Sequence, residues 1–214
     1  MARAGAVAES GFVQADDGDE LLAGYVSGPA AATEATARGL VRAEGAAALV
    51  LVEGVSDQIA VETLARRYGR DLASEGVVVL PSGGVHGIVR YWQRFGPPGA
   101  GVRVVGLCDA GEAHVIRRGL GGQPFFVCVE DLEDELIRAA GTGLVTEVFG
   151  AHGDLGAFRT IQRQPAWRGK DEAAQMRRFL AAGSQRKLRY ARLLVEAVRL
   201  DRVPRPLADL LGAV

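Results

Sequence analysis

The 214-residue chain has only two cysteines, two methionines and three histidines, and none of its apolar runs approaches the ~20 residues that a membrane-spanning helix needs. Cys108 and Cys128 form no Cys-x-x-Cys pair, which argues against a disulfide framework and a cysteine-based zinc site. We expect both to be buried thiols. The first residues lack the apolar core of a signal peptide. A cytoplasmic protein without membrane contact is therefore expected.

Lysine is also scarce, because Lys170 and Lys187 are the only lysines among 25 basic residues. The abundance of arginine is then weak evidence for nucleic-acid binding by itself. The charges are unevenly distributed: residues 1–158 carry 12 basic and 21 acidic side chains (−9), and residues 159–214 carry 13 and 5 (+8). A basic C-terminal segment is compatible with contact to a polyanion, and equally with packing on the acidic remainder.

Two nucleotide-binding motifs are missing from the sequence. No Gly-x-Gly-x-x-Gly follows the first predicted strand, which argues against a dinucleotide site. No Gly-x-x-x-x-Gly-Lys-Ser/Thr occurs anywhere, so the chain has no P-loop of its own. The apolar content of 48% is sufficient for a full hydrophobic core.

Four short apolar runs alternate with segments of helical periodicity. The runs cover residues 49–52, 76–81, 102–108 and 124–129. This alternation predicts an α/β protein with a Rossmann-like parallel sheet of about four strands flanked by helices.

The expected helices are of two groups. One precedes the first strand near 33–43, with Thr33 as N-cap, and two lie between strands near 57–68 and 88–95, the former with Ser56 or Asp57 as N-cap. Those after residue 140 form a C-terminal extension near 143–151, 154–164, 171–182 and 184–201, with Pro204 and Pro206 ending the last. We divide the chain into an N-terminal arm and helix (1–45), a core domain (46–140) and a basic helical extension that packs on the core (141–214).

Acidic residues follow three of the four predicted strands: Glu53 the first, Asp109 the third, and Glu130 with Asp131 the fourth. The carboxyl ends of parallel strands meet at one edge, where open α/β sheets place their ligand sites. Converging carboxylates repel one another unless a cation lies between them, and oxygen ligands suit Mg²⁺ or Mn²⁺. The alternative at each position is a strand that ends at a charged residue on reaching solvent.

Ser82-Gly83-Gly84 follows the second strand and could offer backbone N–H groups to a phosphate, although glycines after a strand are more often only a turn. The histidines, His86, His114 and His152, are interpreted as surface or turn residues, with His86 and His114 nearest the predicted sheet edge.

The strand ends resemble the TOPRIM domain of topoisomerases and primases, and above all that of the OLD (overcoming lysogenization defect) family nucleases. The resemblance rests on Val52-Glu53-Gly54-Val55-Ser56-Asp57, Asp109-Ala110-Gly111-Glu112 and Asp131-Leu132-Glu133, and extends over roughly residues 46–200. It implies a compact Rossmann-like fold and Mg²⁺-dependent phosphodiester chemistry on nucleic acid, with DNA as the expected form.

The resemblance also implies roles for single residues. Glu53 would be a metal ligand or general acid/base, and Lys187 would lie near the scissile phosphate. The remaining metal ligands would be Asp57, Asp109, Asp131 and Glu133.

Two departures from the family pattern bear on activity. Gly111 stands where the second acid of Asp-x-Asp is expected, and Glu112 follows one position later as a candidate replacement ligand. The ATPase half of full-length OLD proteins is absent from this sequence. We therefore predict a stand-alone metal-dependent nuclease, for which a separately encoded ATPase is a candidate partner and a homodimer a compatible state. The alternative is a degenerate module that binds nucleic acid, a nucleotide or a partner ATPase without cleaving.

The position of Lys187 is unusual on grounds independent of the resemblance. On a helix over 187–200 it falls in line with Ala191, Leu194 and Val198, opposite a polar face of Arg189, Arg192, Glu196 and Arg199. A lysine on an apolar stripe needs a polar destination for its amine. It either extends to solvent past the helix end or reaches the acidic sheet edge.

Overall fold

The computed structural model describes residues 18–120 and 125–214, and the first part of the expected N-terminal arm lies outside these ranges. Four parallel strands form one sheet in the order β2-β1-β3-β4. The strands are β1 (Ala48–Val52), β2 (Val77–Pro81), β3 (Arg103–Cys108) and β4 (Phe125–Val127). The α/β fold with a four-stranded parallel sheet is therefore confirmed.

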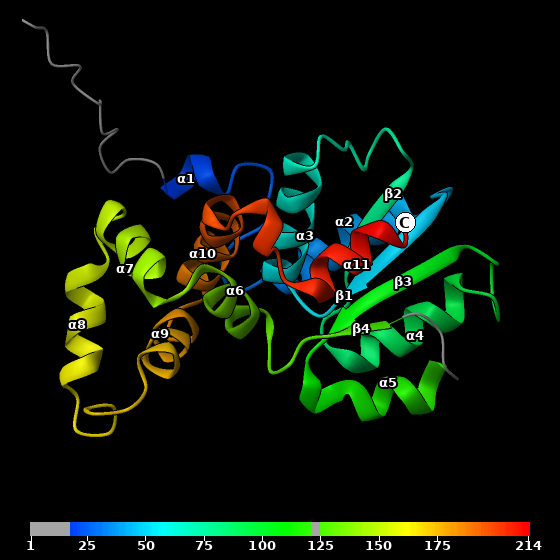
Figure 1. Ribbon diagram of the computed structural model, residues 1–214. Coiled ribbons are helices and arrows are strands. Elements are labelled where there is room, and N and C mark those ends of the chain that lie inside the picture. The colour runs from blue at the N-terminus through cyan, green and yellow to red at the C-terminus, as the bar shows by residue number, and fades with distance from the viewer. Residues whose placement is uncertain (1–17, 121–124) are drawn as a thin grey trace, which may run out of the picture.

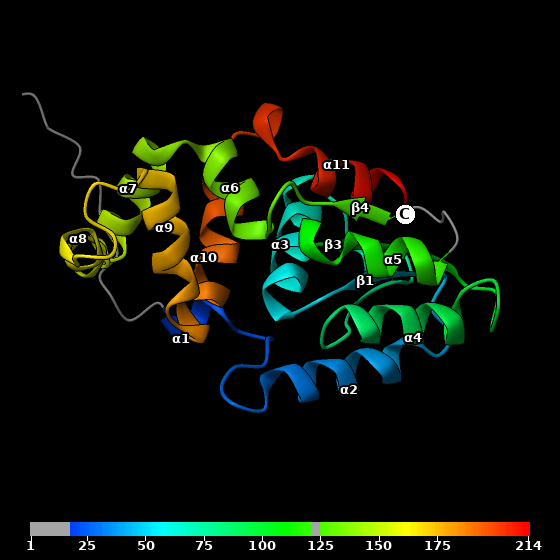
Figure 2. The ribbon, with the colours of Figure 1, turned by 90° about the horizontal axis from the view of Figure 1, so that it is seen from below.

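Helices cover both faces of the sheet (Figures 1 and 2). Alternate residues of β1 serve opposite faces, because side chains in a strand alternate in direction. Leu49 and Leu51 pack with residues of α2 (Ala31–Ala43), α4 (Val85–Phe95) and α5 (Ala113–Leu120). Val50 and Val52 belong to the larger cluster on the other face, which includes residues of α3 (Val55–Arg67) and α11 (Arg205–Gly212).

The remaining helices lie beyond the carboxyl ends of the strands. Helices α6 (Leu132–Ala140) and α10 (Ser184–Ala197) stand between the sheet and the group formed by α7 (Thr142–Ala151), α8 (Leu155–Arg163) and α9 (Glu172–Ala181), as Figures 1 and 2 show. The short α1 (Gly18–Leu21) lies beside α10. Short 3₁₀ turns cover Ala110–Glu112 and Leu200–Arg202.

An aromatic cluster organises the group α7–α10. The rings of Phe149, Phe158, Phe179 and Tyr190 meet edge to face, with centroids 4.9–5.6 Å apart. The Tyr190 hydroxyl donates to Asp154 Oδ2 at 2.8 Å, which satisfies its polar end in the core. These contacts hold α10 in place, and α10 carries Lys187.

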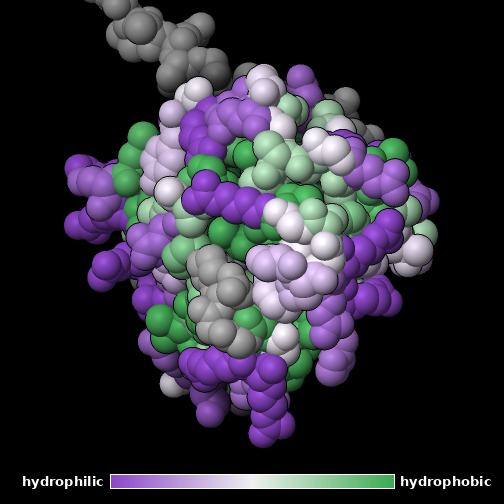
Figure 3. All heavy atoms as spheres, turned by 90° about the vertical axis from the view of Figure 1, so that its right-hand side faces the viewer, coloured by the Kyte–Doolittle hydropathy of each residue, from purple (hydrophilic) through white to green (hydrophobic). Residues whose placement is uncertain are grey.

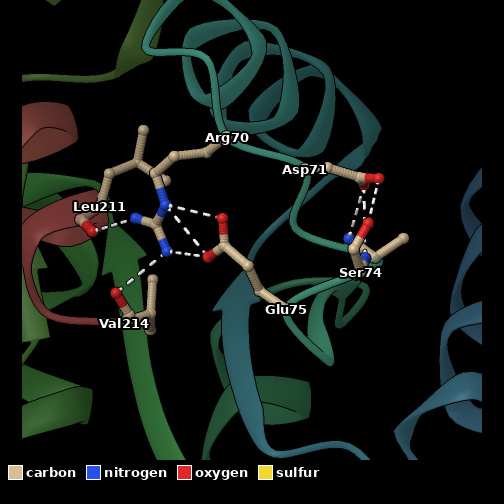
Figure 4. A network of polar contacts seen from close by, with 7 residues as sticks. Arg70, Asp71, Ser74, Glu75, Leu211 and Val214 are labelled. Atoms are coloured by element: carbon tan, nitrogen blue, oxygen red, sulfur yellow. Dashed lines mark hydrogen bonds and ion pairs between the residues drawn. The ribbon is translucent and has the colours of Figure 1, made fainter.

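Helix α11 corrects the prediction that Pro204 and Pro206 end the preceding helix. They instead begin a new helix, with Pro204 as N-cap and Pro206 in the first turn. Proline is tolerated there because the first N–H groups of a helix have no intrahelical partner. The Arg70 guanidinium donates to the carbonyls of Leu211 and Val214 and pairs with Glu75, which ties α11 to the loop before β2 (Figure 4).

Two predicted N-caps were wrong. Helix α2 begins at Ala31, before Thr33, and its N-cap Ala30 makes no side-chain capping bond. The N-cap of α3 is Gly54, and Asp57 occupies the third helical position, from which Oδ2 accepts the Gly54 N–H at 2.8 Å. The two thiols are free and buried, as predicted.

None of the helices within the described ranges combines the length and the apolar character of a membrane span. The face in Figure 3 carries hydrophilic residues round much of its outline with hydrophobic residues between them.

Candidate active site

The site begins where β1 and β3 end side by side. Glu53 follows β1, Asp109 follows β3, and the Asp109 N–H donates to Glu53 Oε1 at 3.0 Å. Parallel pairing of β1 with β3 produces this contact, since it brings the carboxyl ends of both strands to one edge. The two acids that the sequence placed at strand ends therefore meet.

The loop after β2 holds the Glu53 backbone. The N–H groups of Gly83 and Gly84 both donate to the Glu53 carbonyl at 3.1 Å. Ser82 is buried, and its hydroxyl donates to the Val52 carbonyl at 2.7 Å and lies 3.0 Å from that of Gly84. Both glycines have positive φ, 74° and 101°, which favours glycine at each position.

The predicted phosphate-binding role of Ser82, Gly83 and Gly84 is therefore not supported. Their hydrogen-bonding groups are already engaged with the end of β1. The segment positions Glu53, although Gly83 and Gly84 still line the groove described below.

Glu112 extends back to Glu53 from the 3₁₀ turn after β3. The two carboxyl groups lie close enough to interact, and no N–H or O–H group of the described residues donates to the buried Glu112 Oε2. Burial, followed by the contact with Glu112, raises the pKa of Glu53 to about 8. Two adjacent carboxylates need a proton or a cation between them.

Besides Glu53 and Glu112, the acids Asp57, Asp109 and Glu133 lie at the same edge of the sheet. Burial raises the pKa of Asp109 to about 7, and Asp57 and Asp131 add to the effect. Asp57 is buried in the first turn of α3, where burial raises its pKa while the Lys187 ammonium opposes the rise. Glu133, in the first turn of α6, is also buried.

Lys187 reaches the acidic edge, as one of the two sequence alternatives proposed. Its Nζ lies 3.2 Å from Glu133 Oε2, and its side chain remains 41% exposed. Burial lowers the pKa of Lys187, but Glu133 and Asp57 outweigh this, so the net shift is upward and the amine stays charged. Helix α10 ends at Ala197, so Arg199 does not share its polar face as predicted.

Asp131 behaves differently from the other predicted ligands. It is the N-cap of α6, with Oδ1 accepting from the Asp134 N–H at 2.8 Å. Its Oδ2 accepts from Arg177 Nε at 2.7 Å. Both oxygens thus serve protein contacts, and Arg177, from α9, is a participant that the sequence analysis missed. The one sequence feature that could have indicated Arg177 is its position in the basic segment after residue 158.

Among the predicted site residues, those that line a groove of about 510 Å³ are Glu53, Asp57, Gly83, Gly84, Asp109 and Lys187. Its walls are the ends of β1 and β3, the first turns of α2, α3, α6 and α10, and the segment before α2. Residues that sequence analysis did not single out include Gly28, Pro29, Ala31, Ala32, Ser184 and Leu188.

The donor set fits Mg²⁺ or Mn²⁺ in chemistry. Within 18–120 and 125–214, no group of three or more acids, histidines or cysteines is already arranged around one ion position. The available donors are nevertheless all carboxylate oxygens, which hard divalent ions prefer. The buried Glu112 Oε2, which accepts no hydrogen bond from the described residues, and the pKa values that burial raises at Glu53 and Asp109 fit a cation-binding edge.

Comparison with known proteins agrees with this geometry. Residues 46–110, from the start of β1 to just past Asp109, match the family model described as "Overcoming lysogenization defect protein-like, TOPRIM domain". The chain contains an OLD-like TOPRIM domain. No curated protein matches the sequence.

Solved structures extend the likeness beyond the matched segment. The C-terminal region of the Xanthomonas campestris pv. campestris OLD protein superposes with a TM-score of 0.60 at 22% identity, covering 81% of this chain and 94% of that one. The C-terminal region of the Burkholderia pseudomallei OLD protein gives 0.58 at 17% identity, covering 78% and 96%. At these identities the likeness shows the fold, including the helical part that follows the TOPRIM domain.

Proposed function

We propose that this protein hydrolyses phosphodiester bonds in nucleic acid, expected to be DNA, with Mg²⁺ or Mn²⁺ held at the acidic edge of the sheet. OLD-like TOPRIM domains belong to a family of metal-dependent nucleases. The observation that carries the proposal is the convergence of Glu53, Asp109 and Glu112 at two adjacent strand ends, opposite the charged Lys187.

In this proposal Glu53, Asp109 and Glu112 would hold one ion, and Asp57 with Glu133 would offer oxygens for a second. A bound divalent ion supplies an activated water and neutralises charge on the phosphate. Glu112 substitutes for the family acid that Gly111 replaces, because its longer side chain returns to Glu53. Glu53 can also accept or donate a proton, since its carboxyl lies at the carboxyl end of β1 with a raised pKa.

Lys187 would stabilise negative charge on the transferring phosphate. It stays charged because Glu133 and Asp57 raise its pKa more than burial lowers it. Its contact with Glu133 holds the amine at the groove while leaving it partly exposed. A positive group aimed at developing charge is a common source of rate enhancement.

The direct test is nicking of supercoiled plasmid with Mg²⁺, with Mn²⁺ and with chelator. We expect metal-dependent conversion to open circles, no requirement for ATP because the sequence has no P-loop, and loss of activity in Glu53→Gln. Glu147→Gln is the matched control, because Glu147 is an exposed acid on α7, away from the groove. Metal-independent nicking, or equal nicking by Glu53→Gln, would refute the proposal.

A second candidate function is binding without cleavage, to nucleic acid, a nucleotide or a separately encoded ATPase. Gly111 and the lack of a ready-made ion site among the described residues favour it. Unchanged supercoiled plasmid under every metal condition, together with measurable DNA binding, would select this function.

A further inference from the structure

A second, basic pocket is lined by the same helices as the acidic groove. It has a volume of about 690 Å³ and lies between α2, α3, α10 and the segment that follows α1. Its charged lining residues are Arg38, Arg42, Glu62, Arg66 and Arg192. Four arginines and one glutamate give a net +3, opposite in sign to the acidic edge.

The same three helices form the walls of both pockets. Along α3 the lining changes from Asp57 to Arg66, and along α10 from Lys187 to Arg192. Along α2 it changes from Ala31 and Ala32 to Arg38. Each helix thus contributes its first turn to the acidic site and a later turn to the basic pocket.

The N-terminal segment completes both pockets, and Figures 1 and 2 show it running from beside α10 to α2. Gly28 and Pro29 line the acidic groove, whereas Ala23 to Val26 line the basic pocket. A buried apolar cluster joins the two parts, made of Leu22, Ala35, Val55, Ile59, Leu188 and Ala191.

Neutral donors satisfy the acid of the basic pocket, and Arg192 is paired with Glu196 at 2.8 Å, so the available arginines are those of α2. The Tyr25 hydroxyl donates to Glu62 Oε2 at 2.7 Å, and Gln58 donates to Oε1 at 2.9 Å. Burial and the Glu62 charge raise the pKa of Tyr25 to about 12, so this donor persists. Arg38 and Arg42 are both exposed on one turn of α2, and the ion pair of Arg38 with Glu34 is long, at 4.0 Å.

Apolar surface accompanies these charges. Val41 lies between the two α2 arginines in sequence and is 77% exposed, and Tyr25 with Val26 provides further apolar wall. Guanidinium groups next to aromatic and aliphatic faces are the combination that binds unpaired nucleotides, the charges meeting phosphates and the faces meeting bases.

We infer that the basic pocket holds the flank of a single-stranded nucleic acid whose scissile phosphate lies at the acidic edge, an inference that rests on the proposed function. From Asp57 to Arg66, α3 rises about 13 Å at ~1.5 Å per residue, so a flank of a few nucleotides can reach the pocket from the acidic edge. The pocket therefore contributes affinity and strand direction, and it touches no reacting atom.

The test measures binding and needs no cleavage. A fluorescein-labelled oligothymidylate of about 12 nucleotides is titrated with protein in Ca²⁺, and the anisotropy is followed at several salt concentrations. The variant is Arg38→Ala/Arg42→Ala. The matched control is Arg159→Ala/Arg163→Ala, which removes two exposed arginines at the same spacing from α8. A competition arm uses unlabelled duplex.

We expect the α2 variant to lower the salt-dependence slope by about 1.4, because each single-strand phosphate contact contributes ~0.7. Its affinity at 0.1 M salt should then fall about 20-fold, while the control stays near wild type. Wild-type affinity in both variants would overturn the inference and leave the proposed function standing. Equal losses in both, or duplex competing as well as single strand, would also overturn it. Absence of wild-type binding to the oligonucleotide would overturn the inference, and the plasmid-nicking test would still decide the proposed function.

Discussion

At the scale of single residues, the contact between Glu53 and Glu112 decides how Gly111 is interpreted. The sequence placed Glu112 one position too late for the family pattern, so its direction from the strand was open. In the structure the 3₁₀ turn Ala110–Glu112 brings that side chain back to Glu53. Glu112 thus places a carboxylate beside Glu53 and Asp109, although Gly111 stands where the family pattern has its second acid.

The raised pKa of Glu53 predicts a pH-dependent stability in metal-free protein. With a folded pKa of about 8 against 4.5 for the free side chain, the folded state keeps a proton that the unfolded state releases between these values. Stability from this group is complete below about pH 4.5 and is lost as the pH rises through 8. Glu53→Gln stays neutral and can still accept the Asp109 N–H.

We therefore expect Glu53→Gln to gain stability relative to wild type as the pH rises from about 5 to 8, in urea denaturation with EDTA present. Glu147→Gln should show no such trend. A difference between Glu53→Gln and wild type that is constant across this range would contradict the raised pKa.

Lys187 gives the clearest catalytic prediction. Lys187→Met retains the apolar stem on α10 and removes the ammonium that faces Glu133. We expect the variant to fold and its nicking rate to fall by about 10²-fold or more, as loss of one charge-stabilising group typically causes. Lys170→Met is the control, since Lys170 is exposed and is the only other lysine. Nicking at the wild-type rate would remove Lys187 from the site.

At the scale of secondary-structure elements, Asp131 is a motif residue whose carboxylate makes structural contacts. It caps α6 and binds Arg177 of α9, and so fixes the helix whose first turn presents Glu133 to Lys187. The sequence motif alone could not separate these roles, because Arg177 is 46 residues away along the chain.

Helix α11 depends on an anchor that local sequence does not reveal. Arg70 donates to the Leu211 and Val214 carbonyls, at 2.5 and 3.1 Å, across more than 140 residues (Figure 4). Arg70→Met keeps the aliphatic stem but removes these bonds. We expect a loss of about 1–2 kcal/mol in the free energy of unfolding and faster amide exchange in α11.

The control for this prediction is Arg178→Met, an exposed arginine on α9. An unchanged urea midpoint for Arg70→Met, with α11 exchanging as slowly as in wild type, would mean that apolar packing of Leu207, Leu210 and Leu211 alone holds the helix.

At the scale of the whole molecule, repulsion and burial of carboxylates at the acidic edge lower the stability of the folded state, and a bound cation should restore it. Glu53, Asp57 and Asp109 are partly or fully buried and raise one another's pKa or are raised by burial. Millimolar Mg²⁺ or Mn²⁺ should therefore raise the melting temperature, because a ligand that binds only the folded state stabilises it.

Asp109→Asn should abolish this gain, and Asp201→Asn, which changes an exposed acid paired with Arg199, should retain it. Calorimetry or dye-monitored melting with and without metal measures the effect. An unchanged wild-type melting temperature at millimolar metal would count against an ion at this edge.

The core is also a property of the whole molecule. The cluster that contains Val50 and Val52 of β1 also contains Leu194 of α10 and Leu207 of α11. The helices after residue 140 therefore contribute to one continuous core with the sheet. The sequence predicted a C-terminal extension there because no further strand follows residue 140. An apolar helical face in the sequence does not indicate which part of the protein it packs against.

Sequence alone determined the parallel α/β architecture, the strand ends at Glu53 and Asp109, and the buried state of both cysteines. These features follow from local periodicity and from the rule that parallel strands end at one edge. Only the tertiary structure decided that Glu112 meets Glu53, that the Gly83 and Gly84 N–H groups serve Glu53, and that α2, α3 and α10 enclose two pockets of opposite charge. Those outcomes depend on how elements far apart in the chain pack together, which side-chain spacing within one element does not encode.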